Sequence, residues 1–452
     1  MPPRTSKTTA LRVAVLADSD TRWKWGALTA RRLTTGAPDA SRAADRPVEI
    51  SGLLLRGRAT PTPRQLAEVG DVGIETGRVR EVTAVEFLDT VRNEGYDLVV
   101  LALVGGAVQA MLHGLAALRQ AARPVVVTGY VGVVYEKLAD GLLLRHGADV
   151  VLANSRHDAE RFRAVYEGVG ADASAVTEAA LPFLGGAPHR PQEGRDTVVF
   201  AAQPSVPASR ADRTYLLRRL VEHARLHPDR EVLLKLRSKP GEHTTHIEEL
   251  PYQRLAAKLP GGLPPNFSLV YGHMGEVLDR TDLLVTVSST AALESLHRRI
   301  PTAILTDLGV RETLGNHHFI GSGLLTSWDR LDGGSHPEPD EKWLAGQGVA
   351  ADGTYDTAYD TARARVDALL AEDRLPDLTP YYTPATAPGY LPGILARHHL
   401  APDGHPLPGA AAPRETGGVR GAVRDAVREA ARGAYRQGVQ RVAPVIRRMG
   451  EL

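Results

Sequence analysis

The chain of 452 residues contains no cysteine. Without a thiol there can be no disulfide framework, no cysteine-ligated zinc, no iron–sulfur cluster and no thiol nucleophile. A composition free of disulfides fits a reducing compartment, so we expect a cytoplasmic protein.

An excess of charge of either sign is also lacking. The 54 lysine and arginine residues face 53 aspartate and glutamate residues, which leaves a net charge of +1. No bulk electrostatic field would recruit nucleic acid, and we expect no nucleic-acid partner. Lysine is scarce, with 7 residues against 47 arginines, so a loop that holds two lysines stands out.

Long apolar runs are lacking too. The most apolar stretch, residues 98–112, is interrupted by Gly105 and Gly106 and carries Gln109. A membrane-spanning helix needs about 20 apolar residues, and the apolar run near the N-terminus is too short for a signal-peptide core. We therefore expect no transmembrane segment.

What the sequence does contain is a repeated alternation of short β-branched runs with amphipathic stretches. Such alternation is typical of α/β domains with parallel sheets, and the length exceeds what one core accommodates. Residues 184–196, rich in glycine, proline and charge, mark the joint. The sequence predicts two tandem Rossmann-like domains, residues 1–190 and 191–340, with a cleft between them at the carboxyl ends of the strands.

The pattern changes beyond residue 340. Residues 341–413 are dense in proline and predict an irregular segment. Residues 414–452 predict a basic amphipathic helix, in which arginine recurs every four residues from Arg420 to Arg436. Two interpretations stay open: a last helix packed across both domains, or a helix that contacts anionic lipid at the inner face of the membrane.

Carboxylates follow the strands of the first half. Asp18 and Asp20 come directly after the apolar run 12–17, where a dinucleotide site would have its glycine-rich turn. Glu136 lies in the loop after a second apolar run, residues 124–128. A carboxylate at a strand end can deprotonate an acceptor hydroxyl, and these three residues are the catalytic candidates. The alternative for Asp20 is a helix N-cap.

Cations gather after the predicted strand 231–236 in the second half. Lys235, Arg237 and Lys239 adjoin a Pro-Gly turn. Charges of this kind suit a diphosphate or a nucleotide phosphate, so we expect these three residues to bind one. The alternative is a solvated turn with a few charges.

The segment DLLVTVSSTAALESLHRRIPTAIL, residues 282–305, ends an apolar strand on three hydroxyl residues. Ser288, Ser289 and Thr290 open a predicted helix, where free backbone N–H groups favour an anion. Glu294 lies one turn further on the same face, where a carboxylate can accept both hydroxyls of a ribose. These residues predict a nucleotide site, and the alternative is that a serine only caps the helix.

Seven further residues are expected to line the cleft because each follows a predicted strand. They are Gly105, Gly106, Gly129, Gln203, His243, Asn316 and His317. The adjacent pair His317-His318 cannot direct both rings at one ion from an extended loop, and no metal is expected.

These motifs resemble the GT-B superfamily of glycosyltransferases over roughly residues 11–324. One parallel is RHGADVVLANSRHDAERF, which closes the first half, and the other is residues 282–305. The latter is similar to the donor-binding segment of sialic-acid and Kdo-type transferases and of capsule and teichoic-acid enzymes. In the sialic-acid and Kdo-type enzymes a His-Pro pair and a Ser-Ser or Ser-Thr pair hold the nucleotide. Ser288-Ser289 match the second pair, whereas Lys239-Pro240 stand in place of the first. The chain also resembles an uncharacterised actinobacterial family of glycosyltransferases.

The resemblance implies a metal-independent transferase with no cofactor beyond a nucleotide-sugar co-substrate. The donor would lie on the second domain. The acceptor would be a glycan, a small molecule or a lipid-linked molecule of cell-envelope or secondary glycoconjugate synthesis. Three alternatives stay open: a nucleotide-sugar 2-epimerase, a phosphotransferase that uses CDP-alcohols, and a degenerate GT-B module that only binds its ligand.

Overall fold

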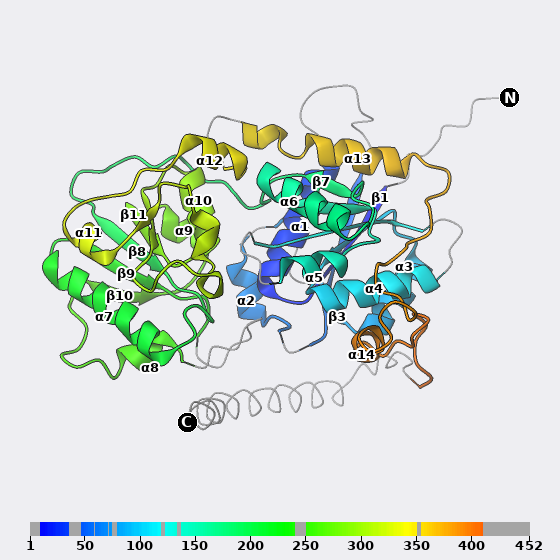
Figure 1. Cartoon of the computed structure of the whole chain (residues 1–452), viewed down its shortest axis with the longest axis horizontal. Coiled ribbons are helices and arrows are strands. Elements are labelled where there is room, and N and C mark those ends of the chain that lie inside the picture. Colours follow the sequence, from blue (N-terminus) through cyan, green and yellow to red (C-terminus); the bar gives the residue numbers. More distant parts are fainter. Residues whose placement is uncertain are drawn as a thin grey trace.

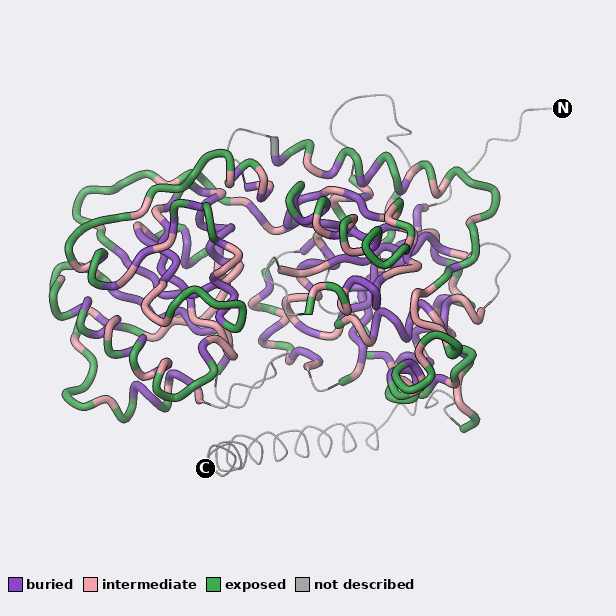
Figure 2. The backbone as a smooth tube through the Cα atoms, viewed as in Figure 1, coloured by how far each residue is buried: buried purple, intermediate pink, exposed green. Residues whose placement is uncertain are grey.

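The computed structural model describes residues 10–35, 47–57, 59–70, 72–74, 79–118, 123–132, 137–239, 250–349 and 354–409. Two α/β domains lie next to each other, the first on the right and the second on the left of Figure 1. The strands form the buried centre of each domain, shown in purple in Figure 2.

Each domain is built on one parallel sheet. The first sheet has the strand order β3-β2-β1-β4-β5-β6-β7, and the second has the order β10-β9-β8-β11-β12-β13. The strands are β1 (Leu11–Ala17), β2 (Val48–Leu55), β3 (Val79–Val82), β4 (Leu98–Ala102), β5 (Val125–Gly129), β6 (Val150–Ala153), β7 (Val176–Glu178), β8 (Thr197–Ala201), β9 (Glu231–Lys235), β10 (Phe267–Val270), β11 (Leu283–Thr286), β12 (Thr302–Leu305) and β13 (Leu325–Thr326). The predicted pair of Rossmann-like α/β domains with parallel sheets is confirmed.

Helices cover both faces of each sheet, and this is why the strands read as continuous apolar runs. The α-helices of the first domain are α1 (Asp20–Thr34), α2 (Pro63–Glu68), α3 (Ala84–Glu94), α4 (Gly105–Ala117), α5 (Leu138–Leu143) and α6 (Arg156–Gly168). Those that follow are α7 (Arg210–Leu226), α8 (Tyr252–Ala256), α9 (Met274–Leu278), α10 (Ala291–His297), α11 (Trp328–Asp332), α12 (Glu341–Gly346), α13 (Asp360–Leu370) and α14 (Leu391–Ala396). Short 3-10 turns are η2 (Glu312–Leu314), η3 (Asn316–Phe319) and η4 (Thr354–Thr357).

The two sheets share one topological feature that positions the site. In each sheet the strand order reverses next to the first strand, between β1 and β4 in one domain and between β8 and β11 in the other. The paired ends Ala17 with Ala102 and Ala201 with Thr286 mark these switch points. Connections leave the sheet in opposite directions there, so a crevice opens at the carboxyl ends of the strands.

Helix α1 starts at the first switch point and is held there by close packing. The Ser19 hydroxyl caps it by accepting a hydrogen bond from the Arg22 backbone N–H at 3.4 Å. Trp23 and Trp25 are fully buried against the sheet. A Cβ added to Gly26 would lie 2.8 Å from the Cβ of Ala102, so only glycine permits this approach. The first turn of α1 is thereby fixed at the edge of the sheet.

The C-terminal part of the described chain returns to the first domain (Figure 1). Helix α13 packs on α1, and α14 packs on α4. Val366 of α13 and Leu395 of α14 belong to the two apolar cores of the first sheet. The expectation that residues 341–413 form an irregular segment is therefore corrected, because apolar residues between the prolines have a core to bury against. The predicted helix 414–452 lies outside the described residues.

Two stretches of chain connect the domains, and they hydrogen-bond to each other. The Tyr355 hydroxyl donates to the Leu181 carbonyl at 2.7 Å, and the Tyr359 hydroxyl donates to the Ala180 carbonyl at 2.7 Å. Both rings are buried.

No described helix combines the length and the apolar character that crossing a bilayer requires.

The packing of α14 on the first domain predicts an effect on stability. Leu395 is fully buried in the core of the first domain, so Leu395→Ala should lower the free energy of unfolding by about 2–5 kcal/mol. Urea unfolding followed by circular dichroism measures the change. Leu226→Ala is the matched control, because Leu226 is 62% exposed and should change stability by less than about 0.5 kcal/mol. Equal midpoints for both variants would contradict the packing of α14.

Candidate functional site

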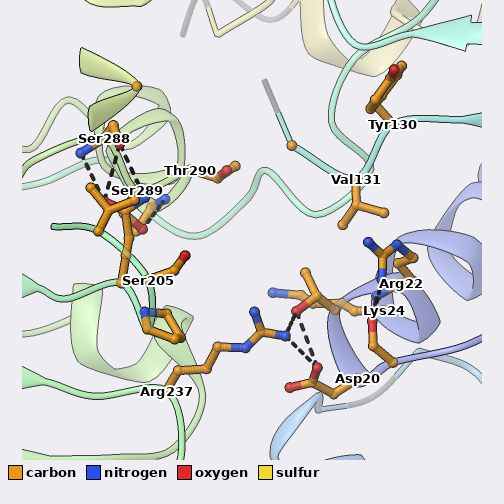
Figure 3. Close-up of a pocket in the computed structure, with 18 of the residues that line it drawn as sticks. Asp20, Arg22, Lys24, Tyr130, Val131, Ser205, Arg237, Ser288, Ser289 and Thr290 are labelled. Carbon is orange, nitrogen blue, oxygen red and sulfur yellow. Dashed lines mark hydrogen bonds and ion pairs between the residues drawn. The ribbon is translucent and has the colours of Figure 1, made fainter. Parts of the chain in front are cut away.

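A cavity of about 740 Å³ lies between the two domains. Its volume falls within the range of about 300–1,000 Å³ that is usual for small-molecule sites. The loops after β1, β4 and β5 line it on one side, and the loops after β8, β9, β10 and β11 line it on the other. The two switch points therefore face each other across one space, and Figure 3 shows part of both walls.

The second-domain wall joins the two clusters that the sequence analysis placed after separate strands. Lys235 ends β9 and Arg237 follows it, Ser288 to Thr290 follow β11, and all of them line the cavity. Strand β8 lies between β9 and β11, and Gln203 follows it. The Gln203 side chain links the strands, since its Nε2 lies 3.2 Å from the Ser288 hydroxyl and its Oε1 accepts from the Ser288 backbone N–H at 3.1 Å.

The three hydroxyl residues differ in what they contact. The Ser288 hydroxyl is buried and donates to the Leu314 carbonyl at 2.5 Å, so it holds the loop after β12. The Ser289 hydroxyl accepts from the Ala291 backbone N–H at 3.3 Å, whereas the Thr290 side chain makes no cap hydrogen bond to α10. Because α10 has only 7 residues, hydroxyl groups and side-chain charges rather than a long helix dipole would favour an anion here.

Buried charges flank this wall. Lys235 is 7% exposed, and its ammonium donates to the Leu236 carbonyl at 2.8 Å. Burial lowers the pKa of Lys235 to about 8, and the charge of nearby Glu68 offsets part of that effect. Burial raises the pKa of Glu294, and the ammonium of Lys24, 3.8 Å away, opposes the rise. The ribose-binding candidate therefore lies within the cavity wall, beside two ammonium groups.

The first domain reaches this wall through α1. The Arg237 guanidinium donates to an Asp20 carboxylate oxygen at 2.5 Å and also contacts the Thr21 hydroxyl (Figure 3). Burial alone would raise the pKa of Asp20, but the charge and hydrogen bond of Arg237 hold it below its usual value. An ion-paired carboxylate of lowered pKa is a weak base, so the geometry favours a role in joining the domains.

Asp18, the other aspartate candidate of this loop, does not line the cavity. One carboxylate oxygen accepts from the Arg22 guanidinium at 2.9 Å, and the other accepts from the Val104 backbone N–H at 2.9 Å. The bond from Arg22 fixes Asp18 to the first turn of α1, and the bond from Val104 ties the end of β1 to the end of β4. Asp18 is thus engaged in closing the switch point.

Some of the remaining candidates from the sequence line the cavity, and others lie outside its lining. Gly105 and Gln203 line the cavity. The expectation for Gly106, Gly129, Asn316 and His317 is corrected, because none of the four lines it. A Cβ on Gly129 would lie 2.8 Å from Trp25, and Asn316 donates to the Leu305 and Gly309 carbonyls, so these two residues serve packing and loop structure. Lys239 also lies outside the lining, while Glu136 and His243 lie outside the described residues.

Several residues of the cavity were not identified from the sequence, among them Lys24, Tyr130 and His273. Lys24 lies four residues after Asp20 on α1, a spacing that places both on one helix face and could have signalled it. Tyr130 follows β5 and lies opposite the serines (Figure 3). His273 follows β10, and burial together with the Lys24 charge lowers its pKa, so its imidazole is neutral near pH 7.

A family model described as "Putative glycosyltransferase (DUF6716)" matches residues 13–369. The chain belongs to this glycosyltransferase family. The match spans both domains and ends within α13. No curated protein sequence matches the chain.

Solved structures of related architecture are similar to this member of the family over most of its length. The Staphylococcus aureus MnaA–UDP structure shares 11% identity at a TM-score of 0.49, covering 79% of this chain and 95% of that chain. The UDP-GlcNAc 2-epimerase from Neisseria meningitidis bound to UDP-GlcNAc shares 10% sequence identity at a TM-score of 0.48, covering 80% of this chain and 100% of that chain. The glycosyltransferase SnogD from Streptomyces nogalater shares 16% sequence identity at a TM-score of 0.41, covering 79% of this chain and 95% of that chain.

One group of metal-ligating side chains occurs in the described part of this family member, away from the cavity lining. Ligand atoms of His223, His227 and Asp332 lie within 4.8 Å of one another, and the i, i+4 histidine spacing is visible in the sequence. The Asp332 carboxylate already contacts His223 Nδ1 at 2.6 Å and the Arg219 guanidinium at 2.9 Å. These contacts satisfy the aspartate as part of the packing of α7 against α11.

The buried ammonium of Lys235 predicts a pH-dependent stability difference. Its pKa is lowered from 10.5 to about 8 in the folded protein, so the unfolded chain binds more protons between these pH values and stability at this group rises with pH. The free energy of unfolding of the wild type relative to Lys235→Met should therefore increase from pH 8 to pH 10.5. Urea titrations at several pH values measure it.

Lys342→Met supplies the control for this measurement, because Lys342 is exposed. The difference in free energy of unfolding between Lys342→Met and the wild type should not change over the same pH range. A flat difference for Lys235→Met as well would contradict the buried position of the Lys235 ammonium.

Proposed function

We propose that this protein is a glycosyltransferase that moves a sugar from a nucleotide-sugar donor to an acceptor hydroxyl without a bound metal ion. The observation that carries the proposal is the meeting of Lys235, Arg237 and the serines after β11 in one interdomain cavity. Family membership supports the reaction class. The acceptor would be a glycan, a small molecule or a lipid-linked molecule in cell-envelope or secondary glycoconjugate synthesis.

The donor phosphate binds to the second-domain wall. Lys235 and Arg237 supply positive charge, and Ser289 and Thr290 supply hydroxyl donors from the neighbouring strand end. Charge-assisted bonds in a site shielded from water are strong, and they stabilise the negative charge that develops on the leaving nucleotide. The cations of the wall thereby perform the task that a metal ion performs in other transferases.

The donor nucleoside lies beside Glu294. This carboxylate lies in the cavity wall 3.8 Å from the Lys24 ammonium. A carboxylate accepts hydrogen bonds from two hydroxyls at once, so it suits the 2′ and 3′ hydroxyls of a ribose. Lys24 belongs to the first domain, and donor binding at Glu294 therefore engages both domains.

Arg237 has a double task in this arrangement. Its guanidinium has five N–H donors, of which the described contacts use those toward Asp20 and Thr21. The remaining donors are available to a phosphate. Donor binding and domain contact then share one side chain, which closes the cavity around the nucleotide.

The first test of the proposal is nucleotide binding in a thermal-shift panel of CMP-, UDP-, GDP- and CDP-linked sugars. A ligand at 100 times its dissociation constant stabilises the folded state by about 2.7 kcal/mol. Lys235→Met should weaken binding of the active compound at least tenfold, because a hydrogen bond to a charged group contributes about 1.5–3 kcal/mol. Ser289→Ala should weaken it several-fold, while Lys342→Met should have no effect. Unchanged affinity in Lys235→Met and Ser289→Ala would refute the phosphate site.

The second test separates the reaction classes. A transferase releases free nucleotide at a rate that rises with an added acceptor, so release should increase with a pool of glycan or lipid-linked acceptors. A 2-epimerase instead converts the donor sugar without an acceptor, which nuclear magnetic resonance detects. A phosphotransferase uses CDP-glycerol and releases CMP, and a binding module shows stabilisation without turnover. Any of these three results would replace the proposed reaction.

A further inference from the structure

Five carboxylates line the cavity in the part of the chain that the structure describes, and four of these either form an ion pair or belong to the second domain. Asp20 is paired with Arg237, and Glu68 is paired with Arg64. Glu294 lies on the donor side beside Lys24, and Glu312 is an exposed residue of the second domain. The fifth, Asp140, belongs to the first domain, and among the described residues no guanidinium or ammonium lies within ion-pair distance of it.

Asp140 is held at the cavity by the short helix α5. The buried Arg145 guanidinium anchors the chain that follows, donating to the Gly129 carbonyl at 3.0 Å and the Leu103 carbonyl at 3.2 Å. It also donates to the Gly141 carbonyl at 2.7 Å, directly after Asp140. The ends of β4 and β5 and the helix α5 are thus fixed together. Asp140 has little freedom to leave the cavity wall.

Two tyrosines from the C-terminal return contact the carboxylate. The Tyr382 hydroxyl donates to Asp140 Oδ1 at 3.0 Å, and the Tyr390 hydroxyl donates to Oδ2 at 3.1 Å. Burial and the Asp140 charge raise the pKa of both tyrosines, so their hydroxyls stay protonated and act as donors. The carboxylate is therefore oriented by two neutral hydrogen-bond donors.

The tyrosines are themselves fixed to the first domain. The Tyr382 carbonyl accepts hydrogen bonds from Gln109 Nε2 at 3.3 Å and His113 Nε2 at 2.9 Å, both on α4. The Tyr382 and Tyr390 rings pack edge to face with centroids 5.3 Å apart. A stretch more than 240 residues away in sequence is therefore fixed to the first domain beside Asp140.

We propose that Asp140, oriented by Tyr382 and Tyr390, is the catalytic base that takes the proton from the acceptor hydroxyl. The inference rests on the proposed transferase function. The acceptor oxygen forms a bond to the anomeric carbon while its proton passes to an Asp140 carboxylate oxygen. The bond from the anomeric carbon to the donor phosphate oxygen breaks, and its electron pair leaves with the nucleotide. Tyr382 and Tyr390 are positioning residues that act through Asp140.

The test compares a nucleophile that must lose a proton with one that has none to lose. Nucleotide release is measured from CMP-N-acetylneuraminic acid, UDP-N-acetylglucosamine, GDP-mannose and CDP-glucose, with water alone and with sodium azide. Azide attacks the anomeric carbon as an anion and yields a glycosyl azide. Asp140→Asn should release nucleotide to water about 100-fold more slowly than the wild type. With azide it should form glycosyl azide at a rate close to that of the wild type.

The double variant Tyr382→Phe with Tyr390→Phe should also release nucleotide to water more slowly than the wild type, though less so than Asp140→Asn. Its rate with azide should stay close to that of the wild type. Asp373→Asn is the matched control, because Asp373 is exposed and remote from the cavity lining, and its rates should equal those of the wild type. Equal loss with water and azide in Asp140→Asn would assign Asp140 a structural role, and no loss with water would exclude it as the base. No release by the wild type from any of the four donors, with no thermal shift, would instead refute the transferase function itself.

Discussion

Every feature of the site depends on one constraint, which is that all strands of a parallel sheet end at the same edge. Each domain here has an all-parallel sheet whose order reverses beside its first strand, and each therefore opens a crevice at that edge. The two crevices face each other across the cavity. Residues that are far apart in the sequence, such as Gln203 and Ser288, meet because their strands are neighbours in this arrangement.

Contacts of α1 make the two crevices into one site. Asp20 and Lys24 lie on one face of this helix and reach Arg237 and Glu294 of the other domain. The same Arg237 that binds Asp20 belongs to the cationic cluster after β9. Domain contact and ligand binding are thus coupled through individual charged side chains, and a charged ligand in the cavity would alter the balance between them.

The C-terminal part of the described chain also brings residues that are distant in sequence to the first domain. Residues 359–409 belong in space to the first domain, although they follow the second domain in sequence. They contribute α13 and α14 to its cores and two tyrosine hydroxyls that donate hydrogen bonds to Asp140. The chain crosses between the domains twice, and the two crossings are bonded through Tyr355 and Tyr359. Asp140 of the cavity lining therefore receives its hydrogen-bond donors from the far end of the described chain.

The sequence by itself determined the α/β class, the division into two domains and the loops that carry chemistry, because apolar runs and helix periodicity are local patterns. It placed Lys235, Arg237 and Ser288 to Thr290 at the edge of the second sheet that lines the cavity, since parallel strands all end at the same edge. Only the tertiary structure decided which loop residues face the cavity, as the different positions of Gly105 and Gly129 illustrate. It also decided the partners of Asp20 and Asp140. Those contacts join residues more than 200 positions apart, and such pairing depends on how whole domains pack.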